Sequence, residues 1–183
     1  KHILTVGGDY MRDYLMSYQF ANNGSKHQYT VDGFAQFDWN PTKYFNVITG
    51  LRFDYYSDSD INHFSPKLGL MYKIGNCSLR GSYAGGFRAP TLKEMYMNFD
   101  MASIFMIYGN PDLKPETSHN FSLSAEYMKG RYNLTVTGFY NVVDNRITTA
   151  WSEALKGQVY TNISNIRISG AEANASVKYP CGL

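Results

Sequence analysis

Residues 31–55 read VDGFAQFDWNPTKYFNVITGLRFDY, and this stretch decides the fold class. Before Asn40, the apolar residues Val31, Phe37 and Trp39 occupy alternate positions with Asp32 and polar neighbours, and the same alternation resumes after residue 44. A period of two places apolar and polar side chains on opposite faces of a β-strand. The Asn-Pro-Thr-Lys segment between the two runs is typical of a tight turn. The stretch therefore predicts two antiparallel strands, each with one apolar and one polar face.

The same period recurs along the chain, whereas helical periodicity appears nowhere over a comparable length. It predicts eight strands, at about residues 1–20, 27–40, 44–57, 63–75, 77–87, 117–129, 131–149 and 158–179. Most are longer than the roughly 5–6 residues usual in soluble sheets. They are long enough for a tilted strand to cross a bilayer, which takes about 9–11 residues.

The composition restricts the function classes. The 183 residues are 44% hydrophobic, 16% aromatic and 17% charged, with a net charge of +2. This charge is too low for a typical nucleic-acid-binding domain. No apolar run reaches the length of about 20 residues that a transmembrane helix needs, and the aromatic content argues against disorder. The mean hydropathy of −0.36 therefore fits apolar residues that are spread singly along strands.

The links between the predicted strands alternate between short and long. Tight turns are expected at residues 40–43, 75–76, 129–130 and 180–182, and longer links at 21–26, 58–62, 88–116 and 151–157. Outer-membrane barrels have short periplasmic turns and long extracellular loops. Two belts of interfacial aromatic residues are expected as well, one near the turns (Trp39, Tyr44, Tyr72, Tyr127, Tyr132, Tyr179) and one near the loops (Tyr29, Tyr55, Phe64, Phe87, Tyr140, Tyr160).

Alternating polar residues are expected on the inner face of such a barrel, among them Asp32, Gln36, Asp38, Arg52, Asp54, Arg80 and Glu126. The pattern as a whole predicts an all-β fold, an antiparallel transmembrane β-barrel or part of one.

The long link at 88–116 is the main candidate for function, because long loops are usually functional. It follows Gly85-Gly86-Phe87, and Pro90 must leave the strand ladder because it has no N–H. Thr91 as N-cap and Glu94 at N3 predict a short helix over 91–97. An apolar run then covers 101–108.

Two segments of this link resemble paired sequence boxes of the TonB-dependent outer-membrane receptors. They are FRAPTLKE at residues 87–94 and GNPDLKPE at residues 109–116. Three further segments are also similar to sequences of that family: GLRFD at 50–54, SPKLG at 65–69 and GAE at 170–172. The resemblance covers nearly the whole chain, 1–183.

The resemblance implies a bacterial outer-membrane location and a barrel of about 22 strands that is closed by an N-terminal plug. It implies partnership with the TonB complex through a missing N-terminal region, and contact with outer-membrane lipid. About eight strands are then present here, without the plug, the TonB box or the closing C-terminal strands. The chain also begins within a strand and ends on a turn, so we expect a piece of a longer barrel.

The family imports scarce nutrient chelates, so the resemblance implies a siderophore, haem or cobalamin as ligand. The ligand-binding candidates are Arg88, Tyr96, Met97, Met101, Met106, Tyr108, Asn110 and Asp112. Arg88 could pair with an anionic ligand or bond within the loop. The haem version of the family carries a His between the two boxes, but residues 91–109 contain none, which weakens haem as the ligand. The apolar residues at 104–107 could contact a ligand or pack within the loop.

Other sites are weakly indicated. Asp58 and Asp60 begin a calcium-loop pattern, but residues 63 and 69 break it. His63 and His119 are weak metal candidates without ligand spacing. Cys77 and Cys181 do not form a disulfide framework. No catalytic motif is found, so we expect neither an enzyme nor a cofactor. The alternative to a receptor segment is a self-contained eight-stranded barrel with a structural or adhesion role.

Overall fold

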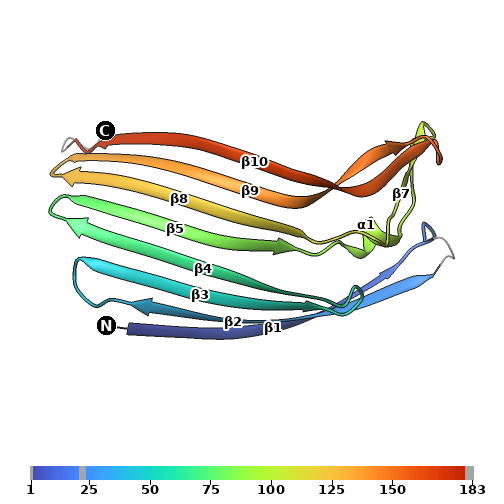
Figure 1. The fold of residues 1–183 in the computed structure, drawn as a ribbon, viewed down its shortest axis with the longest axis horizontal. Coiled ribbons are helices and arrows are strands. Elements are labelled where there is room, and N and C mark those ends of the chain that lie inside the picture. Colours follow the sequence, from blue (N-terminus) through green and yellow to red (C-terminus); the bar gives the residue numbers. More distant parts are fainter. Residues whose placement is uncertain (1, 21–23, 180–183) are drawn as a thin grey trace.

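The computed structural model describes residues 2–20 and 24–179, which form one large β-sheet (Figure 1). Its strands and single short helix, in chain order, are β1 (His2–Met16), β2 (Ser25–Trp39), β3 (Phe45–Tyr56), β4 (Ile61–Ile74), β5 (Cys77–Arg88), α1 (Leu92–Tyr96), β6 (Phe99–Met101), β7 (Phe105–Tyr108), β8 (Glu116–Lys129), β9 (Tyr132–Ser152) and β10 (Gly157–Val177). The eight long strands correspond to the eight predicted ones. No helix in the described ranges has the length and apolar character that crossing a membrane would require.

Neighbouring long strands pair antiparallel in chain order, and the short strands are added at one edge. The order is β1-β2-β3-β4-β5-β8-β9-β10-β7-β6. Strand β7 pairs parallel to β10, through Gln158 with Ile107 and Val159 with Tyr108. Within the described residues, β1 and β10 do not pair, so the sheet does not close on itself. The self-contained eight-stranded barrel, which needs that pairing, is not formed.

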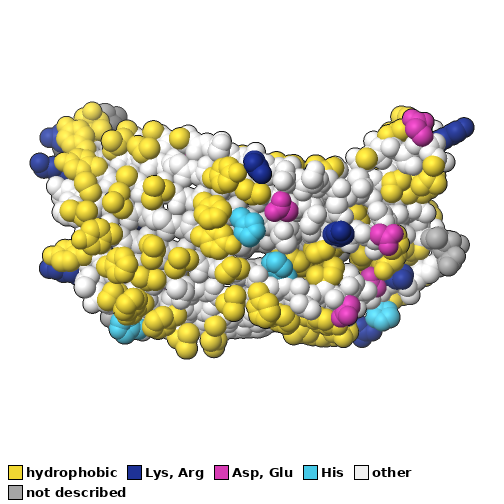
Figure 2. Space-filling model, in the orientation of Figure 1, with side chains coloured by type: hydrophobic (Ala, Val, Ile, Leu, Met, Phe, Trp, Pro, Cys, Tyr) yellow, Lys and Arg dark blue, Asp and Glu magenta, His cyan; other side chains and the backbone are white. Residues whose placement is uncertain are grey.

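The two faces of the sheet differ as the alternation predicted. On β8 the apolar residues Phe121 and Leu123 are exposed, whereas the intervening Ser122 and Ser124 are half-buried. Leu123 is 67% exposed. Figure 2 shows apolar side chains scattered over many strands of one face, with few charges among them. Such an outward apolar face is what a lipid-facing barrel wall presents.

The polar face carries the ion pairs expected of an inner face. Arg52 lies 3.2 Å from Asp32 and 2.9 Å from Asp54, and Arg80 lies 2.8 Å from Glu126. Asp32 and Asp54 are direct cross-strand partners, so the guanidinium between them offsets their mutual repulsion.

The connections fall alternately at two ends of the sheet (Figure 1). We call the end with residues 40–44, 75–76 and 130–131 the short-turn end, and the opposite end the loop end. The expectation that link lengths alternate strictly is wrong. The loop-end links 57–60 and 153–156 are no longer than the turn at 40–44. The reason is that β4 begins two residues earlier than predicted, β9 ends three residues later and β10 begins one residue earlier. Only 17–24 and 89–115 are long. The predicted turn at 180–182, and Cys181, lie outside the described residues.

The aromatic residues predicted for a belt at the short-turn end have the exposure that such a belt requires. Its six members are all at least two-fifths exposed: Trp39, Tyr44, Tyr72, Tyr127, Tyr132 and Tyr179. The belt at the loop end is only partly right. Tyr29, Phe64 and Tyr140 are exposed, but Phe87 stacks on His63 and Tyr160 packs against the buried core. Tyr160 is held by residues of the long link, and Phe87 is held by a ring of strand β4.

Candidate functional site

The long link at 89–115 forms a compact substructure at the loop end, which we call the excursion. Its base is held by Arg88. The Nη1 atom of Arg88 donates to both carboxylate oxygens of Glu94, at 3.1 and 3.0 Å. Its Nη2 atom donates to Oε1 of Glu116 at 2.7 Å, and the same oxygen accepts the Ile147 amide at 2.7 Å. Arg88 therefore bonds within the loop, which is one of the two roles the sequence left open.

Helix α1 follows because its N-terminus is capped as predicted. The Thr91 hydroxyl accepts the Glu94 amide at 3.2 Å, and Glu94 Oε2 accepts the Thr91 amide at 2.9 Å. This capping box satisfies two amides that would otherwise lack partners. Because Glu94 also binds Arg88, one carboxylate joins the helix start to the end of β5.

The second sequence box locks the other end of the excursion to β10. Asn110 Nδ2 donates to the Tyr160 carbonyl at 2.9 Å, and Asn110 Oδ1 accepts the Asp112 amide at 2.9 Å. Asn162 Oδ1 accepts the Lys114 amide at 2.8 Å, and its Nδ2 donates to the Lys114 carbonyl at 2.8 Å. Asn162 was missed from the sequence, because its role depends on a partner 48 residues away.

The excursion reaches across the sheet to the first hairpin. Met97 forms an isolated bridge with Phe20, and the Asn98 amide donates to the Gln19 carbonyl at 3.0 Å. The Lys26 ammonium lies 4.0 Å from the centre of the Tyr96 ring, a cation–π contact. Since β1 and β2 lie four and three places from β5 in the sheet order, the excursion spans the loop end.

A small buried core forms beneath the excursion. Leu92 and Met95 of α1 pack with Leu113 and Ile147, and the partly buried Leu15 of β1 packs against this cluster. The close packing requires Gly109, because a Cβ atom there would lie 2.8 Å from the Met95 carbonyl carbon. This core is the main block of buried apolar side chains in the described residues, so it stabilises the excursion specifically.

A cavity of about 480 Å³ lies between the first box and strands β1 to β3. Its lining includes Leu15, Gln28, Tyr56, Arg88, Pro90 and Leu92. Gln28 is only 5% exposed, and within the described residues its Oε1 atom has no hydrogen-bond donor. Gln28 and Tyr56 were also missed from the sequence, where they read as ordinary strand residues.

The tip of the excursion is apolar and outward. Strands β6 and β7 form a hairpin whose turn has positive φ at Ala102 and Ser103. The Asp100 carboxylate accepts the Ser103 amide at 2.7 Å and holds this turn. Ile104 is 80% exposed and Met101 is 47% exposed. The sequence did not predict β6 and β7, because three- and four-residue strands carry too short a pattern to recognise.

The ligand-binding candidates thus fall into two groups. Met101, Met106, Tyr108 and Asp112 lie in or near the outer part of the excursion, exposed or half-buried. Arg88, Tyr96, Met97 and Asn110 instead make the contacts that hold the excursion in place.

The weak metal candidates do not converge. Among residues 2–20 and 24–179, no group of three or more His, Cys, Asp or Glu side chains could hold a metal ion. The His63 ring stacks on Phe87, 4.4 Å between centres. His119 Nδ1 lies 2.9 Å from the Tyr83 hydroxyl. Asp60 accepts the Tyr55 hydroxyl at 3.2 Å.

The ionisation of the site follows from these contacts. A strand crosses the hydrocarbon in about 9–11 residues, so Arg88 and Glu116, at the loop ends of their strands, lie outside that layer. The hydrogen bond from Arg88, together with the Ile147 amide, lowers the pKa of Glu116, although burial opposes this. The bonds to Glu116 and Glu94 raise the pKa of Arg88. Burial, with the nearby Asp58 carboxylate, raises the pKa of Tyr96 to about 12.

Known proteins resemble nearly the whole chain. A family model described as "TonB dependent receptor-like, beta-barrel" matches residues 1–180. The chain is 32% identical over 161 residues to the iron-regulated outer membrane virulence protein of Vibrio cholerae, covering 79% of this chain and 24% of that protein. It is 38% identical over 90 residues to hemoglobin and hemoglobin-haptoglobin-binding protein C of Haemophilus influenzae, covering 49% of this chain and 8% of that protein.

The fold also matches a solved structure. The siderophore receptor PirA from Pseudomonas aeruginosa superposes with a TM-score of 0.84 at 22% identity, over 95% of this chain and 33% of that one. The chain therefore spans about a quarter of the V. cholerae relative and a third of the solved receptor.

Proposed function

Because the chain belongs to the TonB-dependent receptor family, we propose that the complete protein imports a scarce iron chelate, a siderophore or haem, across the outer membrane. Of the relatives named above, the V. cholerae protein is described as iron-regulated, the H. influenzae protein as haemoglobin-binding and the P. aeruginosa protein as a siderophore receptor. None of those three is named for cobalamin, so cobalamin has only the sequence resemblance in its favour. The proposal is transport rather than catalysis, since two of these relatives are named for a binding or a receptor role.

The observation that carries the proposal is the excursion itself. It is clamped at both ends and extends across the loop end to the first hairpin. It presents the exposed apolar Met101 and Ile104 and covers the cavity that Gln28 lines. A rigid base with an apolar, outward tip suits capture of a bulky chelate, because little ordering is needed on binding.

Within this proposal the candidate residues take different roles. Met101, Met106 and Tyr108 contact the ligand from the tip, together with Asp112. Arg88 and Asn110 position the excursion through their bonds to Glu116 and Tyr160. Transport would then follow plug rearrangement driven through the TonB complex.

The test is a binding screen of the complete receptor against haem and ferric siderophores, followed by deletion of residues 91–108. We expect one chelate to bind, and the deletion to abolish its binding and uptake while the barrel still inserts. A narrower variant replaces residues 99–107 with a Gly-Ser linker and keeps the α1 core. Replacing residues 153–156 in the same way is the matched control. Unchanged ligand binding after the 91–108 deletion would overturn the role of the excursion.

A further inference from the structure

The short-turn end of the sheet carries positive charge without negative charge. Five cationic residues lie within two positions of the strand ends there: Lys43, Lys73, Lys129, Arg131 and Lys178. We call them the basic collar. The segments that hold them, 40–44, 73–76, 129–131 and 178–179, contain no Asp or Glu. Figure 2 shows dark-blue side chains at this end with no magenta among them.

The collar is not neutralised within the described part of the chain, where its five residues form none of the ion pairs. Asp38 and Glu126, on the strands just before two of the turns, are already engaged. Asp38 Oδ1 accepts from Asn40 and Asn46. Glu126 pairs with Arg80 and accepts from Asn133. The charge of the collar is therefore available to an outside partner.

Two collar residues lie directly beside the aromatic belt. The Lys43 ammonium is 4.9 Å from the centre of the Tyr44 ring, and the Arg131 guanidinium is 6.0 Å from that of Tyr132. Both tyrosines are about half exposed. Interfacial tyrosines place the ring at the edge of the hydrocarbon and the hydroxyl among headgroups. A cation at that depth lies at the level of the lipid phosphates.

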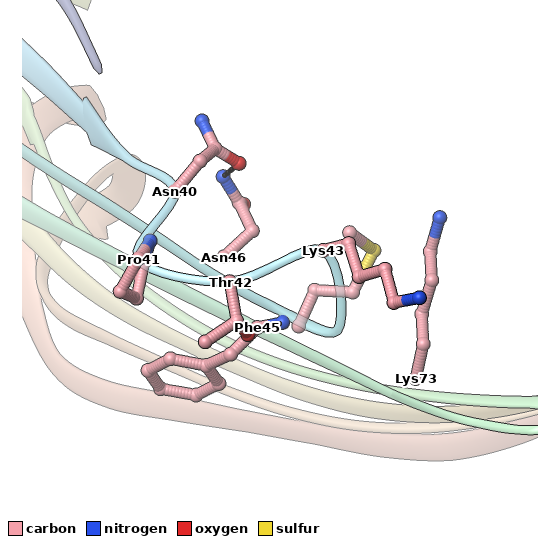
Figure 3. A pocket seen from close by; sticks show the side chains of 8 residues that line it. Asn40, Pro41, Thr42, Lys43, Phe45, Asn46 and Lys73 are labelled. Atoms are coloured by element: carbon pink, nitrogen blue, oxygen red, sulfur yellow. Dashed lines mark hydrogen bonds between the residues drawn. The ribbon is translucent and has the colours of Figure 1, made fainter. Parts of the chain in front are cut away.

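The collar extends along the width of the sheet and is not a single patch. Its members come from the β2–β3, β4–β5 and β8–β9 turns and the end of β10. Lys43 and Lys73 line one hollow of about 420 Å³ together with Asn40 and Asn46. Figure 3 shows the amino groups of the two lysines on the same side of the turn. A line of cations parallel to the belt matches a membrane surface better than a compact protein partner.

The loop end has a different distribution of charge from the short-turn end. There, charges of both signs are interspersed, and Arg88 pairs with Glu94 and Glu116. The asymmetry is therefore specific to the end that short turns identify as periplasmic.

We propose that the basic collar binds anionic phospholipid headgroups of the periplasmic leaflet, with phosphatidylglycerol as the representative lipid. The cations attract the lipid phosphates, while the rings of the neighbouring tyrosines lie at the edge of the acyl-chain region. The collar thereby sets the depth of the barrel in the membrane. This inference rests on the outer-membrane location and not on the identity of the transported ligand.

The test uses the full-length receptor in bilayers of phosphatidylglycerol and phosphatidylcholine with matched acyl chains. Lipid retained after gentle detergent extraction is quantified by native mass spectrometry. We expect phosphatidylglycerol to be enriched several-fold in the wild type, and the enrichment to disappear in the K43Q/K129Q/R131Q variant. The charge-keeping K43R/K129R/R131K variant should retain it.

The matched control removes three exposed cations from the loop end, as K114Q/R146Q/K156Q, and should leave the enrichment unchanged. Raising the salt concentration should abolish the wild-type enrichment without any substitution, so the test does not depend on the variants folding. A wild-type lipid ratio equal to that of the bilayer would overturn the proposal. Equal losses in the collar and control variants would also overturn it, as would an enrichment that resists salt.

Discussion

The Arg88 guanidinium lies 2.7 Å from the Glu116 carboxylate, and the two residues are cross-strand partners although 28 positions separate them. Between them the chain leaves the sheet, crosses the loop end and returns. Their contact closes the base of the excursion, and Glu94 and Ile147 share it. The position of the excursion therefore depends on this closed base.

Substituting Arg88 by Gln should loosen the excursion without unfolding the barrel. The Arg88 side chain is 41% exposed, so solvent screening limits the loss to about 1 kcal/mol of local free energy. That corresponds to about fivefold faster amide exchange in α1 and at Ile147, measured by hydrogen exchange. R80Q, which breaks an ion pair on the polar face, is the control and should leave this exchange unchanged. Unaltered exchange in R88Q would contradict the closed base.

Acid should open the same base. The pKa of Glu116 is lowered in the fold, so its contribution is complete above its ordinary value near 4.5 and is lost as pH falls through the lowered value. We expect the amide protection of the excursion to stay constant from neutral pH to about pH 5 and to fall below it. Glu116→Gln should remove much of this acid dependence. A loss of protection already at pH 6 would indicate a different titrating group.

Gly109→Ala should displace the second box. The new Cβ atom would lie 2.8 Å from the backbone of Met95, and backbone atoms cannot move aside cheaply. We expect a local loss of about 1–3 kcal/mol and weaker ligand binding, measured by exchange at Asn110 and by titration of the complete receptor. Gly138→Ala is the control, because nothing lies within 4 Å of a Cβ atom there. If both variants behave alike, the close approach at Gly109 is not what holds the box.

A charge on the outward face should prevent stable insertion. Leu123 lies at the middle of β8 and is 67% exposed, so Leu123→Lys would place an ammonium in hydrocarbon at a cost of about 2–4 kcal/mol. Ser124→Lys, on the polar face, should cost much less. The folded fraction in lipid vesicles, read from heat-dependent gel mobility, distinguishes them. Equal folding of the two variants would contradict the assignment of the faces.

Ile104→Asp tests the tip. Its side chain is 80% exposed, so barrel stability should change by less than about 0.5 kcal/mol. Ligand affinity should fall about tenfold, equivalent to about 1.4 kcal/mol, if the tip contacts the chelate. Isothermal titration of the complete receptor measures this. Leu155→Asp, an exposed residue of the neighbouring β9–β10 link, is the matched control. An affinity that is the same in both variants would assign the contact elsewhere.

The sequence by itself determined the strands, their two faces and the helix cap. Alternation of period two is a local property, since successive side chains of a strand point to opposite faces whatever the partner strand is. The Thr91–Glu94 capping box is equally local, and so is the turn after Trp39. For this reason, eight long strands, the apolar face and α1 could all be predicted from residues a few positions apart.

The tertiary structure alone decided how the excursion is held and where the sheet ends. The contacts of Asn162 with Lys114, Lys26 with Tyr96 and Arg88 with Glu116 join residues 28 to 70 positions apart. They depend on strand register and on the path of the loop, which no local pattern encodes. The same cause explains three further features: the inward packing of Phe87 and Tyr160, the added strands β6 and β7, and the open edges of the sheet. Each of these features depends on which segments of the chain lie next to one another, and the pairing of all the strands in the sheet decides this.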